Sequence, residues 1–100
     1  MRINIEILEQ RITKKQRSLK IEVKIYLSEK DTGRAINLTK LVKKSKKHNL
    51  EVWYSNTGKI VFKHTLNVLL PIKESISWNK LSKKLKETYT NIIREILKGV

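Results

Sequence analysis

The chain has 100 residues, 39% of them hydrophobic, and we expect one folded domain over residues 1–100 rather than several domains or a disordered chain. Its 23 Lys and Arg residues against 9 Asp and Glu give a formal net charge of +14, which attracts polyanions. The lack of cysteine excludes disulfides, thiolate chemistry and zinc-finger sites.

The N-terminal segment does not have the pattern of a secretion signal. Glu6 and Glu9 stand where a signal peptide needs an unbroken apolar stretch. The longest apolar run is also far shorter than the roughly 18 residues needed to cross a bilayer. We therefore expect an intracellular, cytoplasmic protein with no membrane partner.

Two strands are predicted in the first 28 residues. The segment 2–8 places Ile3, Ile5 and Ile7 on one face of a strand. Residues 9–17 are polar and break this alternation. The segment 18–28 then alternates cleanly, and one face carries the apolar residues Leu19, Ile21, Val23, Ile25 and Leu27.

A helix and a hairpin are predicted next. Asp31, Thr32 and Gly33 form a turn signal, after which Asn37 or Thr39 is a suitable helix cap. Residues 50–55 and 59–64 read as a hairpin around Asn-Thr-Gly, in which Gly58 supplies the positive φ. The second strand of this hairpin extends as far as the proline at position 71.

The last segment predicts a long amphipathic helix capped by Ser75 or Ser77. Its apolar stripe consists of Trp78, Leu81, Leu85, Tyr89, Ile92 and Ile96, later joined by Ile93 and Leu97. The resulting order is β-β-α-β-β-α. This order predicts an α+β fold, with an antiparallel sheet and the C-terminal helix packed on one face.

The first predicted helix carries the densest positive charge. It contains five lysines and no acidic residue: Lys40, Lys43, Lys44, Lys46 and Lys47. A lysine-rich helix face is often only a solvated surface. Solvated faces, however, usually alternate Glu with Lys for i, i+4 support, so the absence of acids here favours contacts with phosphates.

The outer faces of the strands offer further candidates for binding a polyanion. These are Lys20, Lys24, Tyr26, Lys59 and Lys63, together with Trp53 if the third strand turns that residue outward. An exposed indole beside lysines would resemble a stacking platform for single-stranded nucleic acid. The opposite register, which buries Trp53 and exposes Tyr54, remains open.

Catalytic and metal-binding patterns are weak. Glu22 and Lys24 form a Glu-x-Lys tripeptide similar to the second half of a metal-dependent nuclease motif, but the upstream Asp is missing. His48 and His64 have no neighbour at metal-ligand spacing, and we expect them on the surface or at strand ends. The sequence therefore predicts neither an enzyme nor a cofactor or metal site.

The apolar stripe of the last helix has two possible uses. It must pack on the sheet, yet it is wide enough to predict a homodimer contact as well. The residues expected at that contact are Tyr89, Ile92, Ile93, Ile96 and Leu97.

These observations predict a DNA- or RNA-binding protein that uses the phosphate backbone with little base readout, since lysines far outnumber arginines. The alternative is a small accessory protein of viral or plasmid type that docks an acidic protein partner through the same basic surface. A nuclease is the third and weakest hypothesis. No zinc-finger, helix-turn-helix or ribbon-helix-helix signature is recognisable.

Overall fold

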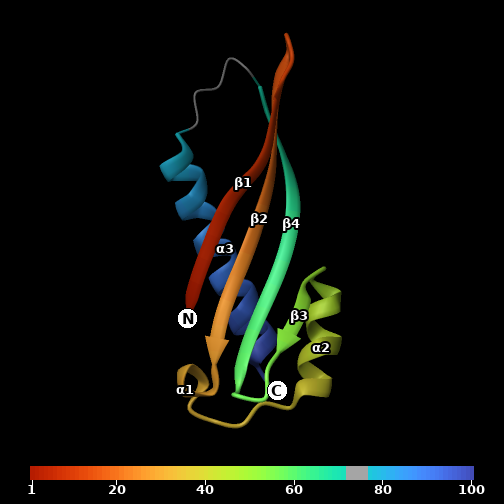
Figure 1. Ribbon diagram of the computed structural model, residues 1–100, viewed down its shortest axis with the longest axis vertical. Helices are drawn as coiled ribbons and strands as arrows, with labels where there is room; N and C mark the ends of the chain where they lie inside the picture. Colours follow the sequence, from red (N-terminus) through yellow and green to blue (C-terminus); the bar gives the residue numbers. More distant parts are fainter. Residues whose placement is uncertain (72–76) are drawn as a thin grey trace.

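The computed structural model describes residues 1–71 and 77–100 (Figure 1). Its elements follow the predicted order, with one additional short helical turn. They are β1 (Arg2–Ile12), β2 (Gln16–Ser28), α1 (Glu29–Thr32), α2 (Leu38–Lys47), β3 (Glu51–Tyr54), β4 (Lys59–Pro71) and α3 (Trp78–Leu97). The α+β fold class predicted from the sequence is confirmed.

The strands of the described residues form one antiparallel sheet with the order β1-β2-β4-β3. The central pair, β2 and β4, stays in register from Gln16 opposite Pro71 to Ser28 opposite Lys59. β1 and β3 are the edge strands. The short β3 covers only the part of β4 that follows the turn at Gly58.

The two faces of the sheet differ sharply. α3 crosses one face diagonally, and α2 lies beside β3 (Figure 1). We call this covered side the core face, because the alternating apolar residues of β2 lie on it with Phe62 and Leu41, all nearly inaccessible to solvent. No described helix covers the other side, which we call the open face.

The alternation fails after Ile7, as the sequence indicates, but the strands extend further than the segments 2–8 and 18–28, because β1 continues to Ile12 and β2 begins at Gln16. A register shift between Ile7 and Glu9 explains why the alternation fails there. An inserted residue in one strand reverses which side chains face the core, so the apolar pattern is lost while the pairing continues. The hairpin formed by β1 and β2 extends beyond the helices at the top of Figure 1.

The caps of both main helices agree with the sequence prediction. The side chain of Asn37 accepts a hydrogen bond from the Lys40 backbone N–H at the start of α2. The Ser77 hydroxyl accepts the corresponding bond from Lys80 in α3. Ser75, the other predicted cap, lies outside the described residues.

One predicted surface residue belongs to the interior. His64 is a mid-strand residue on the core face, half-buried, and its Nδ1 lies 2.6 Å from the hydroxyl of Tyr89. Burial raises the pKa of Tyr89 above its ordinary value. The prediction that His64 lies at the surface or a strand end is therefore wrong, whereas His48 is exposed at the end of α2.

Most of the predicted dimer contact is also interior. Tyr89, Ile93 and Ile96 are only 5%, 1% and 0% exposed, because they pack against the sheet of their own chain. These three residues cannot meet a partner unless the core opens. Ile92 and Leu97 are half-buried, so a dimer contact through them stays a prediction.

Candidate nucleic-acid interface

Four of the five lysines of α2 form an exposed basic surface. Leu41 and Ser45 are buried, and the Ser45 hydroxyl donates to the Leu41 carbonyl oxygen. The opposite side of the helix is exposed and carries Lys40, Lys43, Lys46 and Lys47, which we call the lysine surface. None of these four lysines forms an ion pair with another described residue.

Lys44 differs from its neighbours, although the sequence does not distinguish it. Its ammonium group donates to the carbonyl oxygens of Glu95, at 3.2 Å, and of Lys98. Arg34 donates to a third carbonyl of the same helix end, that of Leu97, at 2.7 Å. Because the end of a helix leaves carbonyls without partners and carries partial negative charge, these cations cap α3. Lys44 is therefore not part of the lysine surface.

Trp53 faces outward. Val52 pairs with Phe62 and Tyr54 with Ile60, so both lie on the core side of β3, while Trp53 lies on the open face beside Val61. The structure thus has the register that exposes the indole, which is 62% accessible. Tyr54 is 58% accessible on the opposite side, because β3 is a short edge strand.

A shallow groove joins Trp53 to the lysine surface. The groove has a volume of about 320 Å³ and lies between α2 and the edge strand β3. Lys46 and Val42 line it from the helix, and Glu51, Val52 and Trp53 line it from the strand. A charged ammonium and an exposed indole, from segments with different secondary structure, therefore border the same depression.

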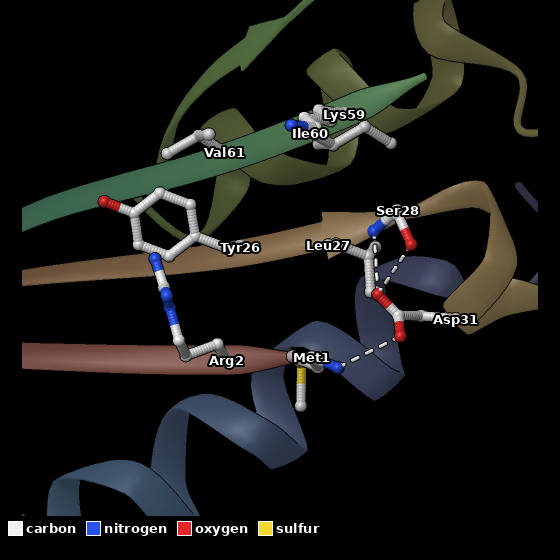
Figure 2. Close-up of a pocket in the computed structure, with 9 residues that line it drawn as sticks. All are labelled: Met1, Arg2, Tyr26, Leu27, Ser28, Asp31, Lys59, Ile60 and Val61. Atoms are coloured by element: carbon white, nitrogen blue, oxygen red, sulfur yellow. Dashed lines mark hydrogen bonds and ion pairs between the residues drawn. The ribbon is translucent and has the colours of Figure 1, made fainter. Parts of the chain in front are cut away.

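On the open face, Trp53 belongs to a row of side chains that crosses the whole sheet. The residues paired across the four strands are Arg2, Tyr26, Val61 and Trp53. We call them the cross-sheet row. The guanidinium carbon of Arg2 lies 4.6 Å from the centre of the Tyr26 ring, a cation–π contact (Figure 2). The row thus combines two aromatic rings, an aliphatic side chain and a cation.

A hollow of about 570 Å³ adjoins this row at the end of the sheet (Figure 2). Tyr26, Val61 and Lys59 line it together with Ser28 and Asp31. The Asp31 carboxylate accepts hydrogen bonds from the backbone N–H of Ser28, at 2.8 Å, and from its hydroxyl. The backbone bond is the main reason that the pKa of Asp31 lies below its usual value, so this carboxylate stays ionised.

The four predicted lysines of β2 and β4 lie on the open face, but two of them are partly neutralised by an acid. The Glu22 carboxylate pairs with Lys24 at 3.4 Å and with Lys63 at 3.5 Å. The predicted contacts Lys20 and Lys59 form no ion pair within the described residues. The face as a whole is only mildly basic, because it also carries Glu6, Glu9, Glu22 and Glu51.

The structure places Glu6 directly opposite Glu22 on neighbouring strands, so two carboxylates share the surface near the Glu-x-Lys tripeptide. Two lysines already pair with Glu22. Within residues 1–71 and 77–100, no three His, Asp or Glu side chains are grouped closely enough to hold a metal ion. The nuclease hypothesis stays a prediction from the Glu-x-Lys tripeptide alone.

Several residues of this site were missed by sequence reasoning. Arg2 and Val61 stand next to Tyr26 only because of the pairing of β1 and β4 with β2, whereas Ser28 lies on β2 itself and Asp31 lines the same hollow from α1. The alternation of the strands predicted which residues face outward, but pairing registers were not predicted. Strand alternation alone therefore could not show that Arg2 covers an aromatic ring.

Comparison with protein-family models, with curated proteins and with solved structures gave no match. Among the described residues, no helix combines the length and the apolar character that crossing a bilayer requires.

Proposed function

We propose that this protein binds nucleic acid through the phosphate backbone, with the lysine surface of α2 as its main contact. The observation that carries the proposal is that Lys40, Lys43, Lys46 and Lys47 are all exposed and unpaired with described residues, on a helix without acids. Lysine ammonium groups displace the counterions condensed on a polyanion and need no fixed geometry. A nucleic-acid partner also fits the cytoplasmic location predicted from the sequence.

Binding of this kind is largely independent of sequence. Phosphate contacts fix position but carry no base information, and guanine readout uses the bidentate fork of arginine, which the lysine surface lacks. Lys20 and Lys59 add charge on the open face. Lys24 and Lys63 contribute less, because Glu22 partly neutralises them.

The test is fluorescence anisotropy of labelled oligonucleotides at a series of salt concentrations. Counterion release predicts that the logarithm of the binding constant falls linearly with the logarithm of salt concentration. Binding that barely changes with salt, or that occurs only with an acidic protein and not with an oligonucleotide, would refute the proposal. In the second case, the accessory-protein hypothesis would take its place.

A further inference from the structure

We propose that the nucleic acid is single-stranded and that it crosses the sheet along the cross-sheet row, with unpaired bases stacked on Trp53 and lodged in the hollow beside Tyr26. This inference rests on the proposed function, because it names the kind of nucleic acid that the same site accepts. Three observations on the described residues carry it.

The first observation is the separation of the two rings. Tyr26 lies on β2 and Trp53 on β3, with β4 between them, so the two positions are two strand spacings apart, roughly 10 Å. Successive bases of a duplex are about 3.4 Å apart and present only their edges in the grooves. Only an unstacked strand can present one base face to Trp53 and place another base in the hollow beside Tyr26.

The second observation is the distribution of acids on the open face. Glu6 and Glu22 face each other two rows beyond Tyr26, and Glu9 follows further along β1. Like charges side by side would repel a phosphate chain that runs along the strands. The cross-sheet row itself contains no acid, so a strand that crosses the sheet at this end avoids these three carboxylates. The acids nearest to its path are Glu51, which lines the groove beside Trp53, and Asp31, which lines the hollow.

The third observation is where the cations stand relative to the row. Lys59 is the next outward residue to Val61 on β4 and lines the hollow, while Arg2 begins the row. At the other end, Trp53 shares its groove with Lys46 of the lysine surface. When bases occupy the row, the phosphates of the same strand therefore lie near Lys59 and Arg2 at one end and near Lys46 at the other. Figure 1 shows β3 and α2 together at the end of the sheet where β1 begins.

The hollow also has dimensions suited to one nucleoside. Pockets of about 300 to 1,000 Å³ accommodate small ligands, and this hollow falls within that range. It offers one aromatic wall, Tyr26, and polar groups from Ser28, Asp31 and Lys59. Either DNA or RNA can supply the base and the phosphate.

The experiment measures binding of the full chain to fluorescent dT12, rU12 and a 12-base-pair duplex by anisotropy, all at the same salt concentration. We expect both single strands to bind at least tenfold more tightly than the duplex, and Trp53→Ala to weaken their binding about tenfold or more. The salt slope should not change in this variant, because the indole carries no charge. Trp53→Phe should recover most of the affinity.

The matched control is Tyr54→Ala, which removes an equally exposed aromatic side chain from the opposite side of the same strand. It should change affinity less than twofold. If Trp53→Ala and Tyr54→Ala have the same effect, or if the duplex binds as tightly as the single strands, the inference is overturned while the proposed function stands. If none of the three oligonucleotides binds, the proposed function fails as well.

A second readout separates stacking from simple charge attraction. In a Trp78→Phe variant, the indole of Trp53 is the remaining tryptophan, and its fluorescence should be quenched by dT12 or rU12. Heparin, a polyanion without bases, should bind without this quenching. Equal quenching by heparin would contradict base stacking on Trp53.

Discussion

Replacing Lys43, Lys46 and Lys47 by glutamine should greatly weaken nucleic-acid binding without unfolding the protein. All three side chains are exposed, and none has an ion-pair partner among the described residues. Glutamine has nearly the same helix propensity as lysine, so α2 should persist. The variant therefore removes charge and changes little else.

The size of the effect follows from counterion release. Each phosphate contact with a single strand contributes about 0.7 to the slope of log affinity against log salt, so three contacts contribute about 2. At about 0.1 M salt this corresponds to roughly a 100-fold loss of affinity, and the loss should shrink toward zero near 1 M. The structure thus predicts a change in both affinity and slope.

The assay is anisotropy of a labelled 12-mer between 50 mM and 400 mM salt, for the wild type and the variant. A variant with the same charge change on α3, Lys83, Lys84 and Lys86 to glutamine, is the matched control because these lysines are also exposed. If both variants lose affinity equally, net charge rather than the lysine surface drives binding. Such a result would refute the reasoning from α2.

Three further predictions concern the fold. Lys44→Met should destabilise the protein by about 1–2 kcal/mol in urea denaturation, because the carbonyls at the end of α3 lose their cation, but should leave the salt slope of binding unchanged. Asn37→Ala should cost about 1 kcal/mol in the same assay, because α2 loses its cap; an unchanged denaturation midpoint would contradict this. Since burial raises the pKa of Tyr89, the folded state holds the phenol proton more firmly than the unfolded state, and this contribution to stability is lost as pH rises above about 10. Between pH 9 and 11 the wild type should therefore lose more stability than Tyr89→Phe, which leaves His64 without its hydroxyl partner; parallel losses would show that Tyr89 is not responsible.

Much of the fold could be predicted because its apolar residues alternate regularly. The odd-numbered residues of β2 from Leu19 to Leu27 are all buried, as their spacing indicates. The same argument, applied to β4, would have placed His64 on the core face between Phe62 and Leu66. Its partner Tyr89 lies 25 residues away on another element, so that contact could not be predicted from local pattern.

Two other features could not be predicted, for physical reasons. The bulge in β1 reverses the alternation after Ile7, and local sequence does not distinguish this from the end of a strand. Lys44 resembles the other lysines of α2, and only the packing of α3 brings the carbonyl oxygens of Glu95 and Lys98 within its reach. Long-range contacts of this kind decide which lysines remain available for a partner.

The candidate site was only partly predictable. The exposed lysines and the outward position of Tyr26 followed from periodicity. For β3, the sequence allowed either Trp53 or Tyr54 to face outward. The pairing of Val52 with Phe62 settles the register, because it places an apolar side chain beside the fully buried ring of Phe62 and turns the indole outward. The cross-sheet row could not be predicted, because it depends on the pairing registers of all four strands.

The central claim, binding through the lysine surface, is tested most directly by the salt dependence of wild-type binding to a single-stranded 12-mer. Four phosphate contacts, from Lys40, Lys43, Lys46 and Lys47, predict a slope of about −3 in a plot of log affinity against log salt. A slope near zero, or no measurable binding at 50 mM salt, would contradict the account.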